Sequence, residues 1–418
     1  MITDHLIDHF FRHEYGKLVS VLSHRVGMRH IEAVEDAVQF ALLTGIDTWV
    51  RKKRPDNPTA WLYRVAHNKL LSELRTQTRH NKILQVNTDE FTDLEELAPE
   101  VSFSAELEDE MLRMLFLCCD ETVPLESQLV FALKSLCGFS IKEISIRLFT
   151  SEANVYKRLS RARKILKETV STTTELSATQ YTKRLAAVNK VLYLLFTEGY
   201  LSSSLASSMR KDLCEEAIRL TLTLVNNPIG RVPESFALLA LMYFHLSRMS
   251  AREDDVGSLL LLEEQDRSLW DKCCIERGMS WLARSAEGAL FSRYHAEAGV
   301  AAEHCLAPSF SQTRWYRVVE CYTLLEQAAP SALHRLNRAV AVAEWKGPLA
   351  GLSVLKEVTP PTWLVSSYLW SAVLADLHLR CGNVELGECF SEKALSLAPT
   401  ETIRTLLRRR LHRSRIKV

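Results

Sequence analysis

The stretch Gly138 to Lys167, GFSIKEISIRLFTSEANVYKRLSRARKILK, has the pattern of two short helices joined by a turn. Ser140 and Glu143 stand three positions apart at the start of the first helix. This is the spacing of a capping box, in which each side chain accepts a hydrogen bond from the backbone N–H of the other residue. Apolar residues then recur at helical spacing in both helices. The stretch therefore predicts a helix-turn-helix.

The second helix of this stretch separates apolar from polar residues. Its apolar positions recur at helical spacing and predict a buried face: Val155, Leu159, Ala162 and Leu166. A different face is polar and basic, and such a face can enter a groove of DNA. The candidate DNA-contacting residues are Ser151, Glu152, Asn154, Lys157, Arg158 and Arg161. The alternative is a solvated basic helix in an ordinary helical bundle.

The chain as a whole is long enough for about two or three domains, since it has 418 residues. Apolar residues make up 47% and charged residues 25% of it, an ordinary globular balance. The net charge is +1, but basic and acidic residues are concentrated in separate segments of the chain. Bases outnumber acids between Arg51 and Lys82, whereas every charged residue from Asp89 to Glu110 is acidic. The overall charge therefore does not indicate the partners.

The ten cysteines form no C-x-x-C pair and no zinc-like spacing, so we expect reduced thiols and neither a metal nor a cofactor. The N-terminus lacks the charged-then-apolar pattern of a signal peptide, and no apolar run approaches the length of a membrane span. A soluble, cytoplasmic protein is expected.

Helical periodicity dominates nearly the whole chain, and alternating strand patterns are almost absent. The predicted fold class is all-α, with two small helical domains followed by a helical-repeat domain. The expected boundaries are 1–84 for the first domain, 85–104 for an acidic linker, 105–170 for the domain with the helix-turn-helix, and 181–418 for the repeats. Thr59 is expected to cap the helix that follows Asn57-Pro58.

The clearest repeat lies near the C-terminus. Ser371 to Pro399 reads as helix, glycine turn, helix, and its small and apolar positions fall close to those of a tetratricopeptide repeat. Leu333 to Val358 has the same rhythm. The chain is therefore expected to end in a tetratricopeptide-like array.

Three segments together resemble the extracytoplasmic-function branch of the sigma-70 family, in the group with a tetratricopeptide-like C-terminal extension. Val34 to Arg75 is similar to sigma region 2. LRMLFLCCD and GFSIKEISIRLFTSEANVYKRLSRAR are similar to region 4. LYLLFTEGY, DLCEEAIRL, LLEEQDRSLWD and RLNRAVAVAE are similar to the extension. The resemblance covers most of the chain.

This resemblance implies a sigma factor, which is not an enzyme and which directs core RNA polymerase to promoter DNA without a membrane partner. Region 2 would bind polymerase and open the minus-ten element, and region 4 would read the minus-thirty-five element with the residues given above. The extension would regulate, through a regulatory protein or through contact with the sigma regions. Its Gln265 to Asp271 segment, which includes Arg267, could contact the sigma regions or polymerase, but a clamp between repeats through a buried Arg–Asp pair is favoured.

The same resemblance implies which region 2 residues bind core polymerase and which bind the minus-ten element. The core polymerase-binding residues would be Asp36, Gln39, Leu42, Leu43 and Trp49. The minus-ten residues would be Arg51, Lys52, Lys53, Arg54, Asn57, Arg64, Asn68, Lys69 and Arg75. Trp61 and Tyr63 could stack on bases, although for Trp61 a structural role is favoured.

Some positions depart from the family pattern. Ser72 and Glu73 replace a frequent Asp and base, Phe149 replaces a frequent Gly in the turn, and Asn154 and Tyr156 replace a frequent Thr and Lys. They leave the preferred promoter sequence open.

Two other functions are alternatives to the sigma factor. The first is a helix-turn-helix transcriptional regulator whose repeats sense a ligand or a peptide, but such a regulator has no need of the basic segment 51–82. The second, a helical-repeat enzyme, has no supporting motif. The basic residues from Arg404 to Lys417 could touch nucleic acid or polymerase, but a cationic helix end favoured by the helix dipole explains them more simply.

Overall fold

The computed structural model describes residues 2–51, 54–82, 103–148, 150–169, 176–200, 211–254, 258–356 and 358–416. Within these ranges the regular structure is helical, apart from one isolated bridge between Glu253 and Leu259. The predicted all-α class is confirmed. The chain divides into two compact units, Met1–Leu195 and Phe196–Val418. Residues 85–102 of the expected acidic linker lie outside the described ranges.

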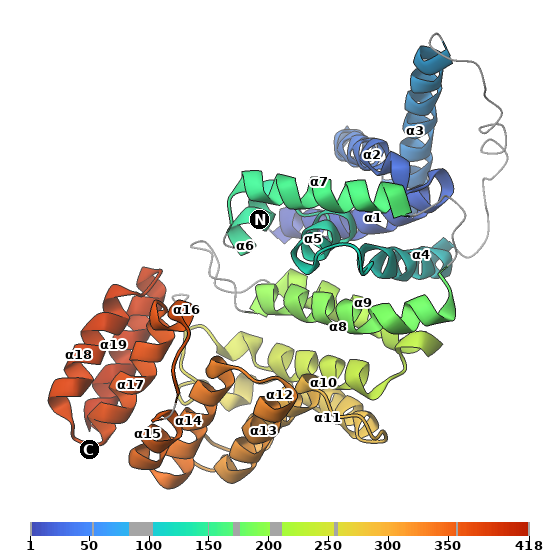
Figure 1. Ribbon diagram of the computed structural model, residues 1–418. Helices are drawn as coiled ribbons and strands as arrows, with labels where there is room; N and C mark the ends of the chain where they lie inside the picture. Colours follow the sequence, from blue (N-terminus) through green and yellow to red (C-terminus); the bar gives the residue numbers. More distant parts are fainter. Residues whose placement is uncertain are drawn as a thin grey trace. The chain divides into compact units, whose positions relative to one another are not determined.

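The first unit begins with three long helices, α1 (Ile2–Val26), α2 (Ile31–Arg51) and α3 (Pro58–Lys82), shown in blue in Figure 1. Their shared core includes Leu18, Ile31 and Leu62, each with an exposed fraction of 0%. The expected cap of α3 is wrong. The Asn57 side chain, not Thr59, accepts the backbone N–H of Ala60 at 3.0 Å, and Pro58 occupies the first helical position, where its missing N–H costs nothing.

The helix-turn-helix lies in the same unit, after α4 (Phe103–Cys118), α5 (Leu125–Phe131) and a π-helical turn (Ala132–Leu136). Its helices are α6 (Ile141–Arg147) and α7 (Glu152–Thr169). The predicted capping box is confirmed: Ser140 N–H donates to Glu143 Oε2 at 2.8 Å, and Glu143 N–H donates to Ser140 Oγ at 3.2 Å. Phe149 lies outside the described residues.

The beginning of α8 (Ala178–Tyr200) also belongs to the first unit. Tyr181 meets Phe116 edge to face, with ring centroids 4.9 Å apart. Arg184 pairs with Asp120 at the end of α4 and donates to the carbonyl of Phe116 at 3.2 Å. The contact division thus falls inside α8, between Leu195 and Phe196.

The second unit is a succession of short helices joined by tight turns. They are α9 (Lys211–Asn226), α10 (Pro233–Ser247), α11 (Lys272–Ser285), α12 (Arg293–Leu306), α13 (Trp315–Ala328), α14 (Ala332–Lys346), α15 (Pro348–Leu355), α16 (Thr362–Val365), α17 (Tyr368–Arg380), α18 (Val384–Ser396) and α19 (Glu401–Ile416). Neighbouring helices in the chain pack against each other, as α10 does with α11 and α17 with α18.

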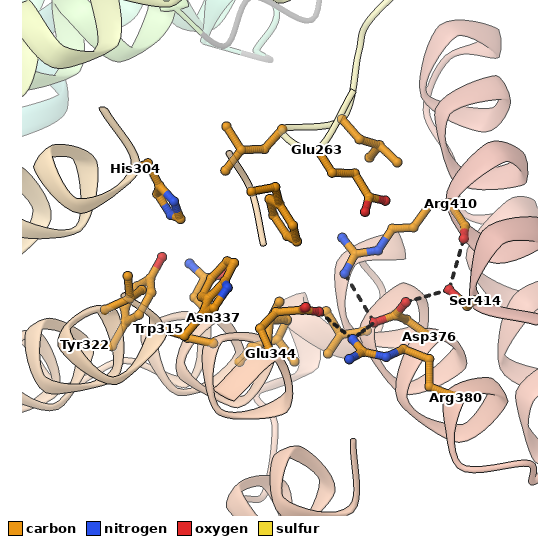
Figure 2. A pocket seen from close by; sticks show the side chains of 18 of the residues that line it. Glu263, His304, Trp315, Tyr322, Asn337, Glu344, Asp376, Arg380, Arg410 and Ser414 are labelled. Atoms are coloured by element: carbon orange, nitrogen blue, oxygen red, sulfur yellow. Dashed lines mark hydrogen bonds and ion pairs between the residues drawn. The ribbon is translucent and has the colours of Figure 1, made fainter. Parts of the chain in front are cut away.

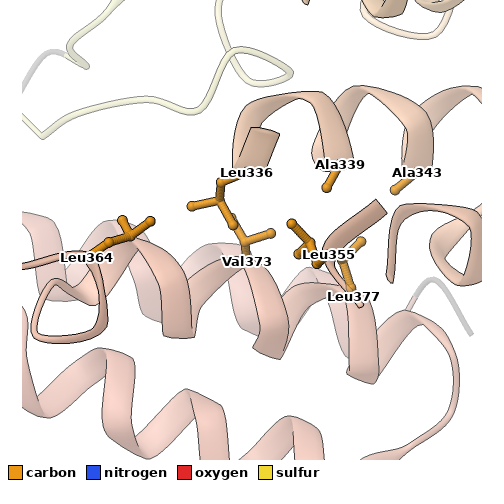
Figure 3. Close-up of a cluster of buried hydrophobic side chains, with 7 residues drawn as sticks. All are labelled: Leu336, Ala339, Ala343, Leu355, Leu364, Val373 and Leu377. Carbon is orange, nitrogen blue, oxygen red and sulfur yellow. The ribbon is translucent and has the colours of Figure 1, made fainter. Parts of the chain in front are cut away.

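The predicted order of helix, glycine turn, helix is confirmed in both C-terminal segments. Gly347 separates α14 from α15 at φ 89°, and Gly382 separates α17 from α18 at φ 78°, values that favour glycine. A buried cluster joins α14, α15, α16 and α17 (Figure 3). Its members are Leu336, Ala339, Ala343, Leu355, Leu364, Val373 and Leu377.

The arginines of α19 are held by carboxylates of the second unit. Arg404 and Arg408 pair with Glu401, Arg410 with Asp376, Arg413 with Glu263 and Glu264, and Arg415 with Glu388. Arg413 and Arg415 lie in the last turn of α19, where the helix dipole favours a cation, and ion pairs hold the arginines in addition. These pairs also reduce the charge available to nucleic acid.

The Gln265 to Asp271 segment is a structural clamp, as favoured, but by a different contact. Arg267 donates to the carbonyls of His304 at 2.5 Å and Ala307 at 2.7 Å, and its guanidinium lies over Trp270. The expected Arg–Asp pair is wrong, because Asp266 and Asp271 instead cap the helical turns that follow them. The free carbonyls at the C-terminal end of α12 are thereby satisfied.

Candidate nucleic-acid interface

Helix α7 presents three different faces. The first is buried, as predicted: Val155 and Ala162 are 0% exposed, Leu159 is 3% and Leu166 is 1% exposed. They fix α7 on α5 and α6 of the same unit. This packing decides which of the other residues of α7 can reach a partner.

The second face carries the predicted DNA-contacting residues, and Asn154, Lys157 and Arg161 are exposed on it. Ser151 and Glu152 are exposed at the N-terminal end of the helix. The Ser151 hydroxyl accepts the backbone N–H of Asn154 at 3.3 Å, so it caps α7. The Asn154 amide donates to Thr150 Oγ1 at 2.9 Å, which fixes the orientation of the amide.

Arg158 differs from these residues. Its guanidinium pairs with Glu126 of α5 at 2.6 Å, and its side chain is only 23% exposed. A carboxylate at this position competes with a phosphate or a base edge for the same guanidinium. Arg158 is thus held by the protein, whereas Lys157 and Arg161 extend into solvent.

The third face of α7 contacts α2. Arg163 donates to Glu32 at 3.0 Å and also pairs with Glu35, and Lys167 reaches Glu32 at 3.3 Å. Ser135 of the π-helical turn donates to the other oxygen of Glu35 at 2.6 Å. These contacts join the helix-turn-helix to the first three helices without covering the second face of α7.

Helix α2 presents an apolar stripe to solvent, edged by a carboxylate and an amide. Asp36 and Gln39 are exposed. Phe40, Leu43 and Ile46 are 46%, 67% and 44% exposed. Positions spaced by three or four residues lie on one helix face, so these five residues form one surface, here named the α2 stripe. Large apolar residues gathered on a soluble surface commonly mark a binding site.

Two of the residues proposed with this group from the sequence lie off the α2 stripe. Leu42 is half-buried. Trp49 packs against Trp61 with ring centroids 5.5 Å apart, and the guanidinium of Arg54 lies over its ring. Phe40 and Ile46 belong to the stripe and were missed. Extending the helical spacing from Asp36 and Gln39 would have found them.

A polar, basic stripe runs along α3. Arg64, Asn68 and Arg75 are exposed and share one face of the helix, since their spacings are four and seven residues. Arg54 and Asn57 are exposed just before α3. Arg51 is exposed and pairs with Asp47 at 2.8 Å. Lys52 and Lys53 lie outside the described residues.

Lys69 stands on another face of α3. Its ammonium pairs with Glu73 at 2.9 Å and lies over the ring of Phe40, beside the α2 stripe. Tyr63 is 7% exposed and its hydroxyl accepts a hydrogen bond from Arg25 at 2.5 Å. Burial rules out base stacking by Tyr63 in this conformation. Trp61 is half-buried against Trp49, in keeping with a structural role.

Among the described residues, no group of three or more His, Cys, Asp or Glu side chains could hold a metal ion. None of the helices in those ranges is both long enough and apolar enough to cross a membrane.

Comparison with known proteins identifies three matched segments. Residues 10–80 match the model of sigma-70 region 2, and residues 113–166 match that of sigma-70 region 4. Residues 184–286 match a family of unknown function, DUF6596. The α2 and α3 stripes thus lie in region 2, and α7 up to Leu166 lies in region 4.

An uncharacterized protein of Rhizobium meliloti (strain 1021) is 32% identical to this chain over 331 residues, which are 78% of each chain. No solved structure matches. The two sigma matches stand in the order in which sigma regions are expected. The chain therefore belongs to the sigma-70 family and is an RNA polymerase sigma factor, with core RNA polymerase and promoter DNA as its partners.

Proposed function

We propose that this protein is a sigma factor of the extracytoplasmic-function type in which three separate surfaces divide the work. The α2 stripe binds core RNA polymerase. The basic stripe of α3, with Arg51, Arg54 and Asn57, holds the minus-ten strand. The exposed face of α7 reads the upstream element. The protein acts in the cytoplasm, where polymerase and promoter are found, and no catalytic step is assigned to it.

The α2 stripe is the observation that carries this proposal. Phe40, Leu43 and Ile46 are exposed on a helix that is otherwise well packed. Leaving such residues in water costs free energy that a partner surface would recover, at about 25 cal/mol per Å² of apolar area. Asp36 and Gln39 beside them can fix the orientation of a partner helix by hydrogen bonding.

The DNA surfaces fit their tasks by charge and by shape. Arg64 and Arg75 can neutralise phosphates along α3, and the Asn68 amide between them can hydrogen-bond to an unpaired base. On α7, Lys157 and Arg161 extend into solvent near the N-terminal end of the helix, which Ser151 caps. This is the end of a recognition helix that contacts bases in the major groove. Arg158 is proposed as a third contact that must first leave Glu126.

The second unit is proposed to be a tetratricopeptide-like regulatory extension. Its antiparallel helix pairs with glycine turns at Gly347 and Gly382 support this assignment. Regulation through such a unit requires a contact with a regulatory protein, with the sigma regions of the same chain or with a smaller ligand.

Run-off transcription with purified core polymerase tests the proposal. The full-length chain should give promoter-dependent transcripts. Asp36→Ala combined with Gln39→Ala, or Leu43→Ala alone, should weaken core binding at least tenfold, whereas Thr76→Ala, an exposed change on α3, should not. Unchanged core binding in both stripe variants would contradict the assignment of the α2 stripe.

A further inference from the structure

The second unit contains a cavity of about 300 Å³, a volume at the lower end of the range in which proteins bind small molecules. It lies between the loop Leu261–Glu263, the C-terminal end of α12, and helices α13, α14, α17 and α19. Only the loop falls within the segment that matches the family of unknown function. Figure 2 shows the cavity with most of the side chains that line it.

One side of the cavity is aromatic and uncharged. Trp315 meets Phe310 and His304 edge to face, with ring centroids 5.1 and 5.4 Å apart. Tyr322 and Asn337 complete this side (Figure 2). Burial raises the pKa of Tyr322 to about 12, and burial together with the nearby arginines lowers the pKa of His304 to about 3. Both rings are therefore neutral near pH 7.

This side also contains polar groups with unused hydrogen-bonding capacity. Within the part of the chain that the structure describes, the Tyr322 hydroxyl and the Asn337 amide have no hydrogen-bond partner, although both residues line the cavity. His304 is 8% exposed, and its Nδ1 has no partner. Buried polar groups are nearly always hydrogen-bonded, so the buried Nδ1 of His304 calls for a ligand or water, and the half-buried side chains of Tyr322 and Asn337 can also bind either.

The other side of the cavity is ionic and carries both signs of charge. Its arginines are Arg380, Arg410 and Arg413, and its carboxylates are Glu263, Glu344 and Asp376. Arg380 donates to Glu344 at 2.6 Å, and Ser414 donates to Asp376 at 2.6 Å. Arg410 contacts Asp376 only at 3.4 Å. Most of the five N–H donors of the Arg410 guanidinium are therefore available for a ligand.

Two residues that do not line the cavity, Arg267 and Glu264, help to hold its walls. Arg267 holds the carbonyl of His304 at 2.5 Å, and Arg413 of α19 holds Glu264, next to the loop, at 3.1 Å. The loop is therefore held to α19 beside the cavity. A site whose walls are held by ion pairs and backbone contacts is preorganised, which lowers the entropic cost of binding.

We propose that this cavity binds a small zwitterion with an aromatic or large apolar side chain, which is an amino acid or a dipeptide. The side chain packs against Phe310 and Trp315, while Tyr322 and Asn337 hydrogen-bond to its polar groups. Its carboxylate pairs with Arg410, and its ammonium group pairs with Glu344 or Glu263. The three arginines and three carboxylates already pair with one another, so a singly charged ligand would take one partner from a pair and leave the other uncompensated, whereas a zwitterion can pair with both.

Calorimetry on the full-length chain tests this proposal with four probes. L-phenylalanine and the dipeptide Phe-Gly keep both charges, 3-phenylpropionate lacks the ammonium group, and phenethylamine lacks the carboxylate. At least one zwitterion should bind saturably and at least tenfold more tightly than either singly charged probe. Tighter binding of L-phenylalanine would indicate a free amino acid as the ligand, and tighter binding of Phe-Gly would indicate a dipeptide. No saturable binding below about 10 mM, or equal binding of 3-phenylpropionate, would overturn the proposal.

Two variants and one control locate the binding. Arg410→Gln should weaken the zwitterion at least tenfold, while Arg408→Gln, a change of the same kind on the same helix but outside the cavity, should leave it unchanged. Tyr322→Phe keeps the ring and removes only the hydroxyl, so it should fold normally and weaken binding several-fold. If Tyr322→Phe and a correctly folded Arg410→Gln variant both bound the zwitterion as tightly as the natural chain, the ligand would not bind in this cavity. The readout is binding itself and is independent of the polymerase and promoter surfaces.

Discussion

Arg163 of α7 pairs with Glu35 of α2, and this contact joins the helix proposed to read DNA to the helix proposed to bind polymerase. Glu35 is 3% exposed and also accepts a hydrogen bond from Ser135. The sigma regions therefore share one compact unit in the free chain, with a buried carboxylate between them.

This arrangement cannot span a promoter. The minus-ten and minus-thirty-five elements are about 25 base pairs apart, or about 85 Å at 3.4 Å per base pair. A compact unit of the length of Met1–Leu195 has a radius of gyration of about 16 Å. Binding to both elements at once thus requires the contact between α7 and α2 to open, and the free energy of that contact opposes initiation.

Arg163→Ala should destabilise the first unit and favour the open state. The change leaves the Glu35 carboxylate with Ser135 as its remaining partner, at a cost of about 1–3 kcal/mol. Urea unfolding should report this loss. Core polymerase should bind the variant more tightly, because less free energy is spent on opening. Lys164→Ala, an exposed change on the same helix, is the control, and tighter core binding by it as well would rule out this explanation.

Arg161→Ala and Arg158→Ala should affect upstream DNA differently. Arg161 is exposed, so its loss should weaken binding and reduce the slope of log affinity against log salt by about 1. Arg158 is held by Glu126, so its loss should have a smaller effect on affinity. Fluorescence anisotropy over a salt series measures both.

Lys167→Ala removes a charge from the face of α7 that contacts α2 and is the matched control for both DNA variants. A salt slope that falls equally in Lys167→Ala and Arg161→Ala would mean that charge in general, and not the exposed face of α7, determines DNA binding.

Arg184→Ala should loosen α8 from α4. Arg184 and Asp120 are each 7% exposed, and removing one partner of a buried ion pair costs about 3–5 kcal/mol because the other charge stays buried. Hydrogen exchange should accelerate at the beginning of α8 and the end of α4. Lys183→Ala, its exposed neighbour, should leave exchange unchanged. Normal protection in Arg184→Ala would show that apolar contacts such as Tyr181 with Phe116 suffice.

The sequence predicted local features best where a single helix determined them. The capping box of Ser140 and Glu143 and the buried face of α7 depend on spacing within one helix, and both are confirmed. The glycine turns at Gly347 and Gly382 are confirmed for the same reason, since a positive φ is a local requirement.

Contacts between distant segments could not be predicted in this way. Nothing near Arg158 in the sequence indicates Glu126, and nothing near Arg413 indicates Glu263 and Glu264. The cavity of the second unit combines residues from Leu261 to Ser414, so no short motif marks it. Only the packing of helices brings these residues together, and helical periodicity predicts which residues share a helix face but not which helices pack against each other.

Glu198 should make stability fall as pH rises, the reverse of the usual behaviour of a carboxylate. Burial raises its pKa from 4.5 to about 7, so between these values the folded state binds more protons than the unfolded state and loses stability with increasing pH. The loss should reach about 1–2 kcal/mol by pH 8, below the limit set by 1.36 kcal/mol per pKa unit, because Glu198 is partly exposed. Urea unfolding at pH 5.5 and pH 8 should therefore show a smaller difference for Glu198→Gln than for the natural chain, whereas Glu215→Gln, at an exposed position on α9, should keep it. If the free energy of unfolding depended equally on pH in the natural chain and in Glu198→Gln, the raised pKa of Glu198 would be contradicted.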